Sequence, residues 1–490
     1  MADPQIVQGG MGVAISGWRL ARSVSVLGQL GVVSGTALDV LLARRLQDGD
    51  PDGDIRRAVA AFPVPAVAQW VLDAYYVPGG LDADAMYRPV PRHTVASSSR
   101  LVELTVLANF VEVWLAKEGH PGRVGINYLK KIDLPLPASM YGALLAGVDD
   151  VLVGAGSPAE IPALLRALAR HEDVTLSTKV QLARSDEDLG TVAFSPRGVF
   201  GSSTVASFGS LRVPRMTAIV ASVDLAAGLA ADPVTRPDGF VVEGPSAGGH
   251  NAPPRGPRRI DAEGQPVYDD RDVVDIEQIV ALGLPVWLAG SYGSPSRLLE
   301  ALALGAAGIQ VGTAFAYCDE SGMSPALRQA ALTALDEGSL KVRADWRASP
   351  TGFPFHVAEL PQTWTDPAAV AERAPVCDLG VLRSPYRTDA GEVDYRCPAE
   401  PLPAYLRKGG REANVDGRVC LCNALFATAG HPSRRRGGVV EPPLLTSGSD
   451  LAPVVELLRR RREASGAAAG EASYAPRYSA ADVITYLLCG

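Results

Sequence analysis

Short apolar segments alternate with longer helical patterns along the first two thirds of the chain. Segments such as 151–153 and 285–289 are apolar throughout and lack the polar alternation of a half-exposed strand. Such strands are typical of parallel sheets that are covered on both faces. The pattern therefore predicts an α/β fold built on a parallel sheet. The expected strands are residues 5–8, 30–34, 123–128, 150–153, 175–180, 216–222, 239–243, 285–289 and 308–312, and the expected helices include 157–170, 224–230, 272–282 and 294–304.

A closed (β/α)8 TIM barrel needs eight strands, one fewer than this pattern supplies. Residues 181–214 are rich in Gly, Ser, Arg and Pro, so we assign the strand 175–180 partly to an insertion and take 216–222 as the fifth barrel strand. Residues 41–120 form a second, helical insertion, in which 101–117 has the pattern of an amphipathic helix. We therefore predict a (β/α)8 barrel domain over residues 1–340 with these two insertions.

The alternation stops near residue 340. Residues 345–450 contain many prolines and glycines and four of the six cysteines, with little periodicity. A helical pattern follows at 451–462, and a short closing helix is expected at 479–488 with Ser479 as its N-cap. We predict that residues 341–490 form an irregular, cysteine-containing extension that packs on the barrel.

Composition narrows the classes of function. The chain is 47% hydrophobic and 20% charged, enough apolar sequence for a large core. Its net charge of −8 gives no field that would attract nucleic acid or an anionic membrane, and the basic runs 434–436 and 459–462 are expected on the solvated surface. No apolar run approaches the ~18–20 residues of a membrane helix, and the first residues lack the features of a signal peptide. A cytoplasmic location without nucleic-acid or membrane partners is expected.

The ends of the first and third expected strands carry glycines or polar residues that are candidates for a binding site. Gly10, Met11 and Gly12 follow the first strand, where glycines let a flat ring system approach the backbone because no Cβ intervenes. An ordinary turn would have the same composition. Asn127 ends the third strand, and its amide offers a donor and an acceptor to a heterocycle, although a strand-end Asn also serves as a helix cap.

The loop after strand 239–243 combines several chemical groups. Glu243, Ser246, Gly248, Gly249 and His250 lie within eight residues. An imidazole on a glycine-rich loop can act as an acid or a base near neutral pH, so His250 is the candidate catalytic residue. The alternative is a surface histidine without a catalytic role.

The last two strand ends predict a phosphate site. Gly290, Ser291 and Gly293 follow one strand, and Gly312 and Thr313 follow the next. Backbone N–H groups from these ends, with the start of a helix at 294–296, favour an anion. Many (β/α)8 barrels bind phosphate in the loops after their seventh and eighth strands.

The cysteines leave more than one interpretation open. Cys377, Cys397, Cys420 and Cys422 lie in one irregular region, and four thiolates could bind zinc or an iron–sulfur cluster. Their spacing lacks the C-x2-C pairs of common metal sites. We therefore expect reduced structural thiols and no metal, with a metal or a disulfide as the alternative.

Taken in order, these stretches resemble the nitronate monooxygenase family, formerly called 2-nitropropane dioxygenases, and the related FMN-dependent enoyl-acyl-carrier-protein reductases. The resemblance covers roughly residues 5–335, with a further similar patch at 348–355. It implies an FMN barrel in which the residues named above line the flavin and its phosphate, with His250 on the substrate side. Many members have Gln where this chain has Glu243, and Tyr292 replaces a smaller residue, so its ring is expected to face the flavin or the pocket.

The resemblance implies an enzyme that oxidises a nitronate or a similar carbanionic small molecule, with O2 as co-substrate. The alternative is an NAD(P)H-dependent reductase of an enoyl thioester, because both reactions use the same flavin face. A third hypothesis, a flavin-binding subunit without catalysis, fits poorly with His250 beside the flavin. A homodimer is compatible with an exposed barrel.

Overall fold

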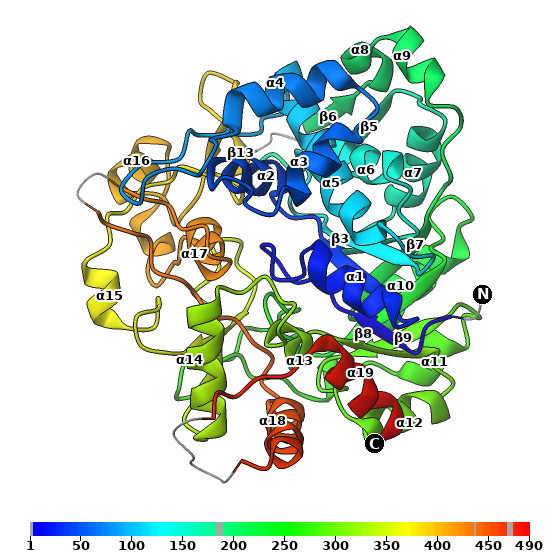
Figure 1. The fold of residues 1–490 in the computed structure, drawn as a ribbon, viewed down its shortest axis with the longest axis vertical. Helices are drawn as coiled ribbons and strands as arrows, with labels where there is room; N and C mark the ends of the chain where they lie inside the picture. The colour runs from blue at the N-terminus through cyan, green and yellow to red at the C-terminus, as the bar shows by residue number, and fades with distance from the viewer. Residues whose placement is uncertain (1–2, 183–189, 436–437, 468–473) are drawn as a thin grey trace.

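Eight parallel strands form the central sheet of the computed structural model, which describes residues 3–182, 190–435, 438–467 and 474–490. The sheet order is β1-β10-β9-β8-β7-β4-β3-β2. Barrel strands that are consecutive along the chain therefore lie side by side in the sheet. Figure 1 shows these strands in one half of the molecule. They are β1 (Ile6–Gln8), β2 (Gly31–Ser34), β3 (Val124–Leu129), β4 (Asp150–Gly154), β7 (Arg215–Val220), β8 (Gly239–Glu243), β9 (Val286–Ala289) and β10 (Gly308–Val311).

The sheet closes where β1 meets β2. The Gln8 N–H donates to the Leu30 carbonyl (2.9 Å), the Leu30 N–H donates to the Ile6 carbonyl (3.1 Å), and Val7 and Leu30 form a parallel bridge. The Gln8 side chain also accepts from the Val32 N–H at 3.0 Å. With every edge paired, the predicted (β/α)8 barrel is confirmed.

The ninth expected strand lies outside the barrel. Strand β5 (Val174–Thr178) pairs in antiparallel fashion with β6 (Gly190–Phe194), whereas β7 pairs with β4 and β8. The assignment of the fifth barrel strand to residues near 216 is therefore confirmed. The inserted segment begins earlier than predicted, at β5, and continues through α8 (Pro196–Phe200) and α9 (Ser202–Ser207). Of the predicted insertion 181–214, residues 183–189 lie outside the described residues.

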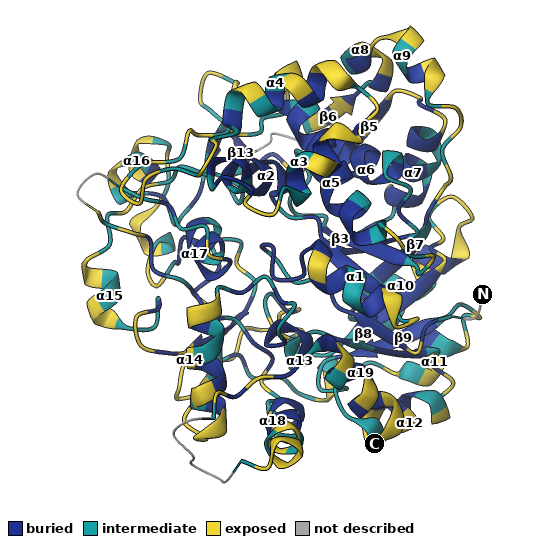
Figure 2. Cartoon of the chain, viewed as in Figure 1, coloured by how far each residue is buried: buried dark blue, intermediate teal, exposed yellow. Residues whose placement is uncertain are grey.

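Helices cover the outside of the barrel, and Figure 2 shows buried strands beneath partly exposed helices. Within the described residues, no helix is both long and apolar enough to cross a membrane. Besides α8 and α9, the α-helices that precede the end of β10 are α1 (Trp18–Val26), α2 (Leu38–Gln47), α3 (Asp54–Ala60), α4 (Pro65–Tyr75), α5 (Ser99–Lys117), α6 (Leu136–Leu145), α7 (Ile161–Ala169), α10 (Val223–Ala231), α11 (Ile276–Val280) and α12 (Pro295–Ala303).

Two helices differ from the sequence-based expectation. Helix α5 was expected to be amphipathic, but most of its residues are buried because α1, α2, α3, α4 and α6 all pack against it. Its one buried carboxylate, Glu112, forms an ion pair with Arg45, which compensates part of the cost of burying a charge. The expected helix 272–282 is shortened to α11, because Asp275 caps it by accepting from the Gln278 N–H (3.1 Å).

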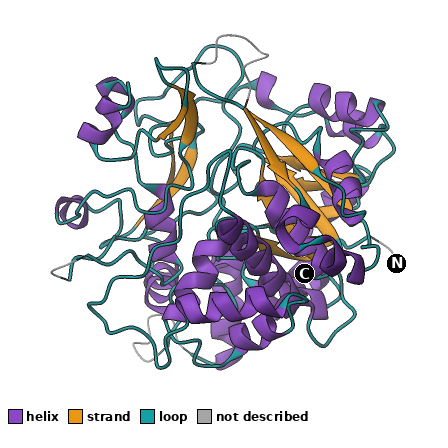
Figure 3. Ribbon diagram, turned by 90° about the horizontal axis from the view of Figure 1, so that it is seen from above, coloured by secondary structure: helices purple, strands orange, loops and turns teal. Residues whose placement is uncertain are grey.

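The extension after residue 340 contains more regular structure than its sequence indicates. It has two antiparallel hairpins, β11 (Lys341–Asp345) with β12 (Phe355–Glu359) and β13 (Ser384–Arg387) with β14 (Val393–Arg396). Figure 3 colours the strands orange and shows them among helices and long loops. The division between barrel and extension at residue 340 stays a prediction. Further helices are α13 (Thr313–Ala316), α14 (Pro325–Asp336), α15 (Pro367–Ala371), α16 (Leu402–Arg407), α17 (Leu421–Thr428), α18 (Ala452–Ser465) and α19 (Ala480–Cys489).

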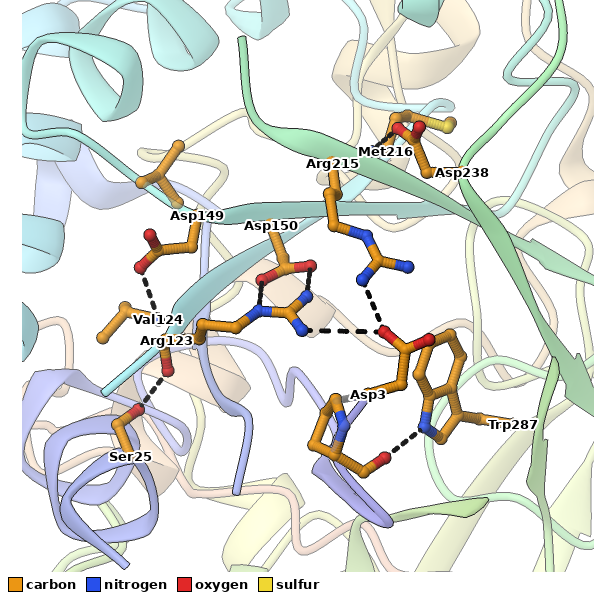
Figure 4. A network of polar contacts seen from close by, with 12 residues as sticks. Asp3, Ser25, Arg123, Val124, Asp149, Asp150, Arg215, Met216, Asp238 and Trp287 are labelled. Carbon is orange, nitrogen blue, oxygen red and sulfur yellow. Dashed lines mark hydrogen bonds and ion pairs between the residues drawn. The ribbon is translucent and has the colours of Figure 1, made fainter. Parts of the chain in front are cut away.

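A network of charges joins the amino-terminal ends of the barrel strands (Figure 4). Arg123 lies between the carboxylates of Asp150 and Asp3, and Arg215 also pairs with Asp3. The Trp287 indole N–H donates to the Pro4 carbonyl at 2.8 Å. Because removing one partner of a buried pair leaves a charge uncompensated, at a cost of about 3–5 kcal/mol, this end of the barrel is built for stability. The active site is therefore expected at the carboxyl ends of the barrel strands.

Candidate active site

A cavity with a volume of about 470 Å³ lies at the carboxyl ends of the barrel strands. All eight barrel strands contribute to it at or just after their carboxyl ends. All the site residues predicted from the sequence line this one cavity, while their individual roles stay predictions. They are Gly10, Met11, Gly12, Asn127, Glu243, Ser246, Gly248, Gly249, His250, Gly290, Ser291, Gly293, Gly312 and Thr313.

The glycines of the cavity have two different reasons to be glycine. A Cβ on Gly10 would lie 2.3 Å from the Asn127 Cβ, so this residue is small because the chain packs against it. At Gly312 the nearest atom to an added Cβ is the Met11 Sδ, at an ordinary 3.7 Å, and the backbone φ is −106°. Since the chain itself does not require a glycine at 312, the space there fits a ligand lying on the backbone.

His250 is held by residues from the start of the extension. Its Nε2 lies 2.6 Å from the Ser349 Oγ and 3.3 Å from the Thr351 Oγ1. The ring of Phe355 packs edge-on against the imidazole, with 4.8 Å between the ring centroids. A bridge between His250 and Phe355 joins the two backbones. These contacts fix the imidazole in one orientation, which a group that transfers protons requires.

Three ionisable groups influence one another around His250. Desolvation, followed by the charge of Lys131, lowers the pKa of His250 well below its usual value. Desolvation raises the pKa of Glu243 to about 7 and lowers that of Lys131 to about 7, while each charge partly offsets the shift of the other. At neutral pH the imidazole is therefore uncharged, and Glu243 is protonated in about half of the molecules.

Lys131 was not predicted from the sequence. Its Nζ is buried, has no hydrogen-bond partner among the described residues, and lies 4.7 Å from the centroid of the Phe353 ring. Phe353 lines the cavity, whereas Lys131 lies behind that lining. The available signal was its position, four residues after Asn127 at a barrel strand end. Ser349 and Phe355 belong to the patch 348–355. The sequence analysis noted the resemblance of this patch to the family but predicted no functional role for it.

Hydroxyl groups gather at the predicted phosphate end. The Ser291 hydroxyl donates to the Ser246 Oγ (2.8 Å), and the Thr313 Oγ1 accepts from the Gly448 N–H (3.0 Å). Among the described residues, the hydroxyls of Ser246 and Thr313 donate to no acceptor, so both remain able to donate to a bound phosphate. The helix start at 294–296 does not line the cavity, because Ser294 and Ser296 face each other outside it.

A segment near the carboxyl end of the chain completes the cavity wall. Residues 446–448, together with Asp450, line the cavity. The Gly249 N–H donates to the Thr446 Oγ1 (3.0 Å), and the Ser449 N–H donates to the Ser246 carbonyl (3.2 Å). No local sequence pattern predicts this contact, because it joins positions almost 200 residues apart in the chain. Tyr292 also lines the cavity, as expected.

Comparison with known proteins identifies one family. The model of the family described as nitronate monooxygenase matches residues 205–348. This segment includes the Glu243–His250 loop and both predicted phosphate loops, and it is shorter than the 5–335 expected from the sequence. No curated protein matches the chain.

Three solved structures match the chain weakly, with TM-scores below 0.4. FabK from Thermotoga maritima is 17% identical and covers 76% of this chain and 74% of its own, with a TM-score of 0.36. Nitroalkane oxidase from Streptomyces ansochromogenes is 15% identical over 72% of this chain and 76% of its own, with a TM-score of 0.36. The enoyl reductase domain of MlnA from Bacillus amyloliquefaciens is 11% identical over 76% of this chain and 67% of its own, with a TM-score of 0.38.

The barrel, the position of the cavity at its carboxyl end and the matched segment agree with one another. The protein thus resembles the nitronate monooxygenase family, and residues 205–348 carry the match.

Proposed function

We propose that the chain is an FMN-dependent oxidoreductase that oxidises a nitronate, or a similar carbanionic small molecule, with O2. The observation that carries this proposal is the convergence of the predicted flavin residues and His250 on one cavity of about 470 Å³, a volume in the range of cofactor sites. FMN, when bound, would supply the electron-accepting chemistry.

The residues fit such a cofactor at both ends. Gly290, Ser291, Gly293, Gly312 and Thr313 would hold the phosphate, since they combine backbone N–H groups with a hydroxyl that is free to donate. Gly10, Met11, Gly12 and Asn127 would lie against the ring system. Glu243, Ser246, Gly248 and Gly249 would complete the wall.

Glu243 takes the place of a glutamine that is common in the family. With a pKa raised to about 7, its carboxyl group carries a proton in a large fraction of molecules at neutral pH. A protonated carboxyl group both donates and accepts a hydrogen bond, as an amide does. The substitution therefore preserves the hydrogen-bonding pattern more closely than the change in formal charge indicates.

His250 would receive a proton from the carbon of a neutral nitroalkane, which yields the nitronate, or orient the nitronate anion itself. Its lowered pKa favours the first role, because the imidazole is neutral and able to accept a proton over the physiological pH range. Lys131, behind the Phe353 ring, would attract an anionic substrate without direct contact. Met11, Leu129 and Ile219 are among the apolar residues that would exclude water.

The absorbance spectrum of the purified chain tests this proposal. We expect flavin bands, identification of the released cofactor as FMN, and anaerobic bleaching of the bands by an alkyl nitronate. Bleaching by NADH or NADPH alone, with turnover of an enoyl thioester, would assign the reductase activity instead. If the protein bound no flavin even after FMN was added, both assignments would be wrong.

Replacing Lys131 with methionine is expected to move the acidic limb of the pH profile of kcat/KM to higher pH. Lys131 is protonated below its pKa of about 7, and its charge is one of two causes that lower the pKa of His250. Without this charge, only desolvation remains, so the His250 pKa rises and the neutral base is lost at a higher pH. The measurement is the pH dependence of oxidation of a neutral nitroalkane from pH 4 to 8.

Lys130→Met is the matched control. The Lys130 Nζ donates to the Ser177 carbonyl at 3.1 Å, and Lys130 does not line the cavity. Its loss is expected to leave the acidic limb in place. An unshifted limb in Lys131→Met, with the wild-type amount of bound FMN, would show that Lys131 does not influence the catalytic base.

A further inference from the structure

The four cysteines of the extension surround one small cavity, although they come from three separate segments. Cys377 follows α15, Cys397 follows β14, and Cys420 and Cys422 lie at the start of α17. All four are free thiols, and Cys397 and Cys420 are buried. Four thiols collected in this way form a set of ligands for a soft metal centre.

The arrangement favours a cluster over a single ion. In the described part of the chain, no three His, Cys, Asp or Glu side chains form a group that could hold a metal ion as they stand. A single tetrahedral zinc needs its four sulfurs within bonding distance of one point, with Zn–S of about 2.3 Å. An iron–sulfur cluster needs its cysteines further apart, because irons and sulfides lie between them. Four cysteines from three segments line one cavity here, and four cysteine thiolates are the ligand set that such a cluster takes.

Positive charge near the thiols supports the same conclusion. Arg383 lines the cysteine cavity, and its guanidinium donates to the carbonyls of Gly380 (3.2 Å) and His93 (3.1 Å). Arg92 donates to the carbonyls of Cys377 and Asp378. Neither arginine forms an ion pair within the described ranges of the chain. Four thiolates around an iron–sulfur core carry a net negative charge, which these two guanidinium groups would compensate.

Nearby carboxylates do not oppose this charge balance. Glu400 is paired with Lys408 at 2.7 Å, and Asp378 is paired with Arg435 at 3.0 Å. The two arginines therefore remain available to the thiols. A buried thiol set without such compensation would resist deprotonation, which every metal–thiolate bond requires.

The cysteine cavity directly adjoins the candidate active site. Leu382, Leu421 and Cys422 line both cavities. A centre bound by the cysteines would thus be separated from the catalytic cavity by single side chains. This position agrees with a redox centre better than with a structural ion placed at random in the extension.

We propose that Cys377, Cys397, Cys420 and Cys422 bind a [4Fe–4S] cluster beside the catalytic cavity. This replaces the expectation of reduced structural thiols without a metal. The proposal does not depend on the identity of the flavin or the substrate, because it concerns a different set of ligands.

Iron and acid-labile sulfide in the full-length protein, purified without oxygen from iron-supplied cells, test the proposal. We expect about four of each per chain, and a paramagnetic signal after reduction with dithionite. FMN is measured separately, after release from the protein, so that loss of flavin and loss of iron are distinguished. One zinc per chain without sulfide, or four reduced thiols that take up no iron and sulfide on anaerobic reconstitution, would overturn the proposal.

Two serine variants locate the ligands. Cys397→Ser is expected to reduce the iron content to less than half, while the exposed Cys489 gives the control Cys489→Ser with unchanged iron. If Cys397→Ser fails to fold, the metal and sulfide content of the wild-type protein still decides the question. Wild-type iron content in a folded Cys397→Ser variant would contradict the assignment of this ligand.

Discussion

Replacing His250 with alanine is expected to lower kcat for oxidation of a neutral nitroalkane, the carbon acid of the nitronate, by about 10²–10⁴-fold, the usual contribution of a positioned acid or base, while FMN stays bound. The imidazole is neutral because desolvation lowers its pKa, and its ring is fixed by Ser349 and Phe355. Alanine removes the proton acceptor and leaves the phosphate end of the cavity intact. The measurements are steady-state rates and the flavin-to-protein absorbance ratio.

A second variant separates proton transfer from packing. His250→Gln keeps a polar side chain near the Ser349 Oγ but cannot act as a base at neutral pH. It is therefore expected to lose activity almost as severely as alanine. His120→Ala is the control, because His120 contacts the Ala116 carbonyl and does not line the cavity. Full activity in either His250 variant would show that this residue is not the proton acceptor.

Gly312→Ala is expected to weaken FMN binding at least tenfold, about 1.4 kcal/mol, with little change in the free energy of unfolding. The added Cβ would come no nearer than 3.7 Å to the Met11 Sδ, so the polypeptide can accept it without strain. It would occupy space where the proposed phosphate lies against the backbone. Titration of the apoprotein with FMN and thermal unfolding without FMN give the two quantities.

Gly228→Ala is the matched control for this change. Gly228 lies in α10, away from the cavity, and an added Cβ there meets no atom within 4 Å. Alanine in a helix is expected to stabilise the protein by roughly 0.5–1 kcal/mol and to leave FMN affinity unchanged. Equal FMN affinity in Gly312→Ala and the wild type would place the phosphate elsewhere.

The sequence predicted the barrel because strand composition is a local property. Continuous apolar segments such as 239–242 identify doubly covered strands, and the composition of 181–214 marked the insertion. Chain order then predicted the shared cavity, since the carboxyl ends of all barrel strands lie on one face. Gly10 was predicted in the correct place for an incomplete reason: its backbone packs on Asn127.

Features that depend on distant contacts were not predictable. Helix α5 has the pattern of an amphipathic helix, yet six other helices contact it. Lys131 differs from Lys130 only in the direction that its side chain takes from a loop, which no periodicity encodes. Ser349 and residues 446–448 reach the site through pairings of about 100 and 200 residues in sequence separation. Such pairings are set by tertiary packing, which local pattern does not report.

The wall formed by residues 446–450 also has a consequence for the order of events during protein synthesis. The Gly448 N–H that contacts Thr313 is made 135 residues after it. At ordinary translation rates this interval lasts on the order of ten seconds, during which the barrel strands are complete but the cavity lacks one side. A nascent chain therefore presents an open, incomplete pocket, and capture of a ligand in its final geometry has to wait until residues 446–450 have been synthesised and folded.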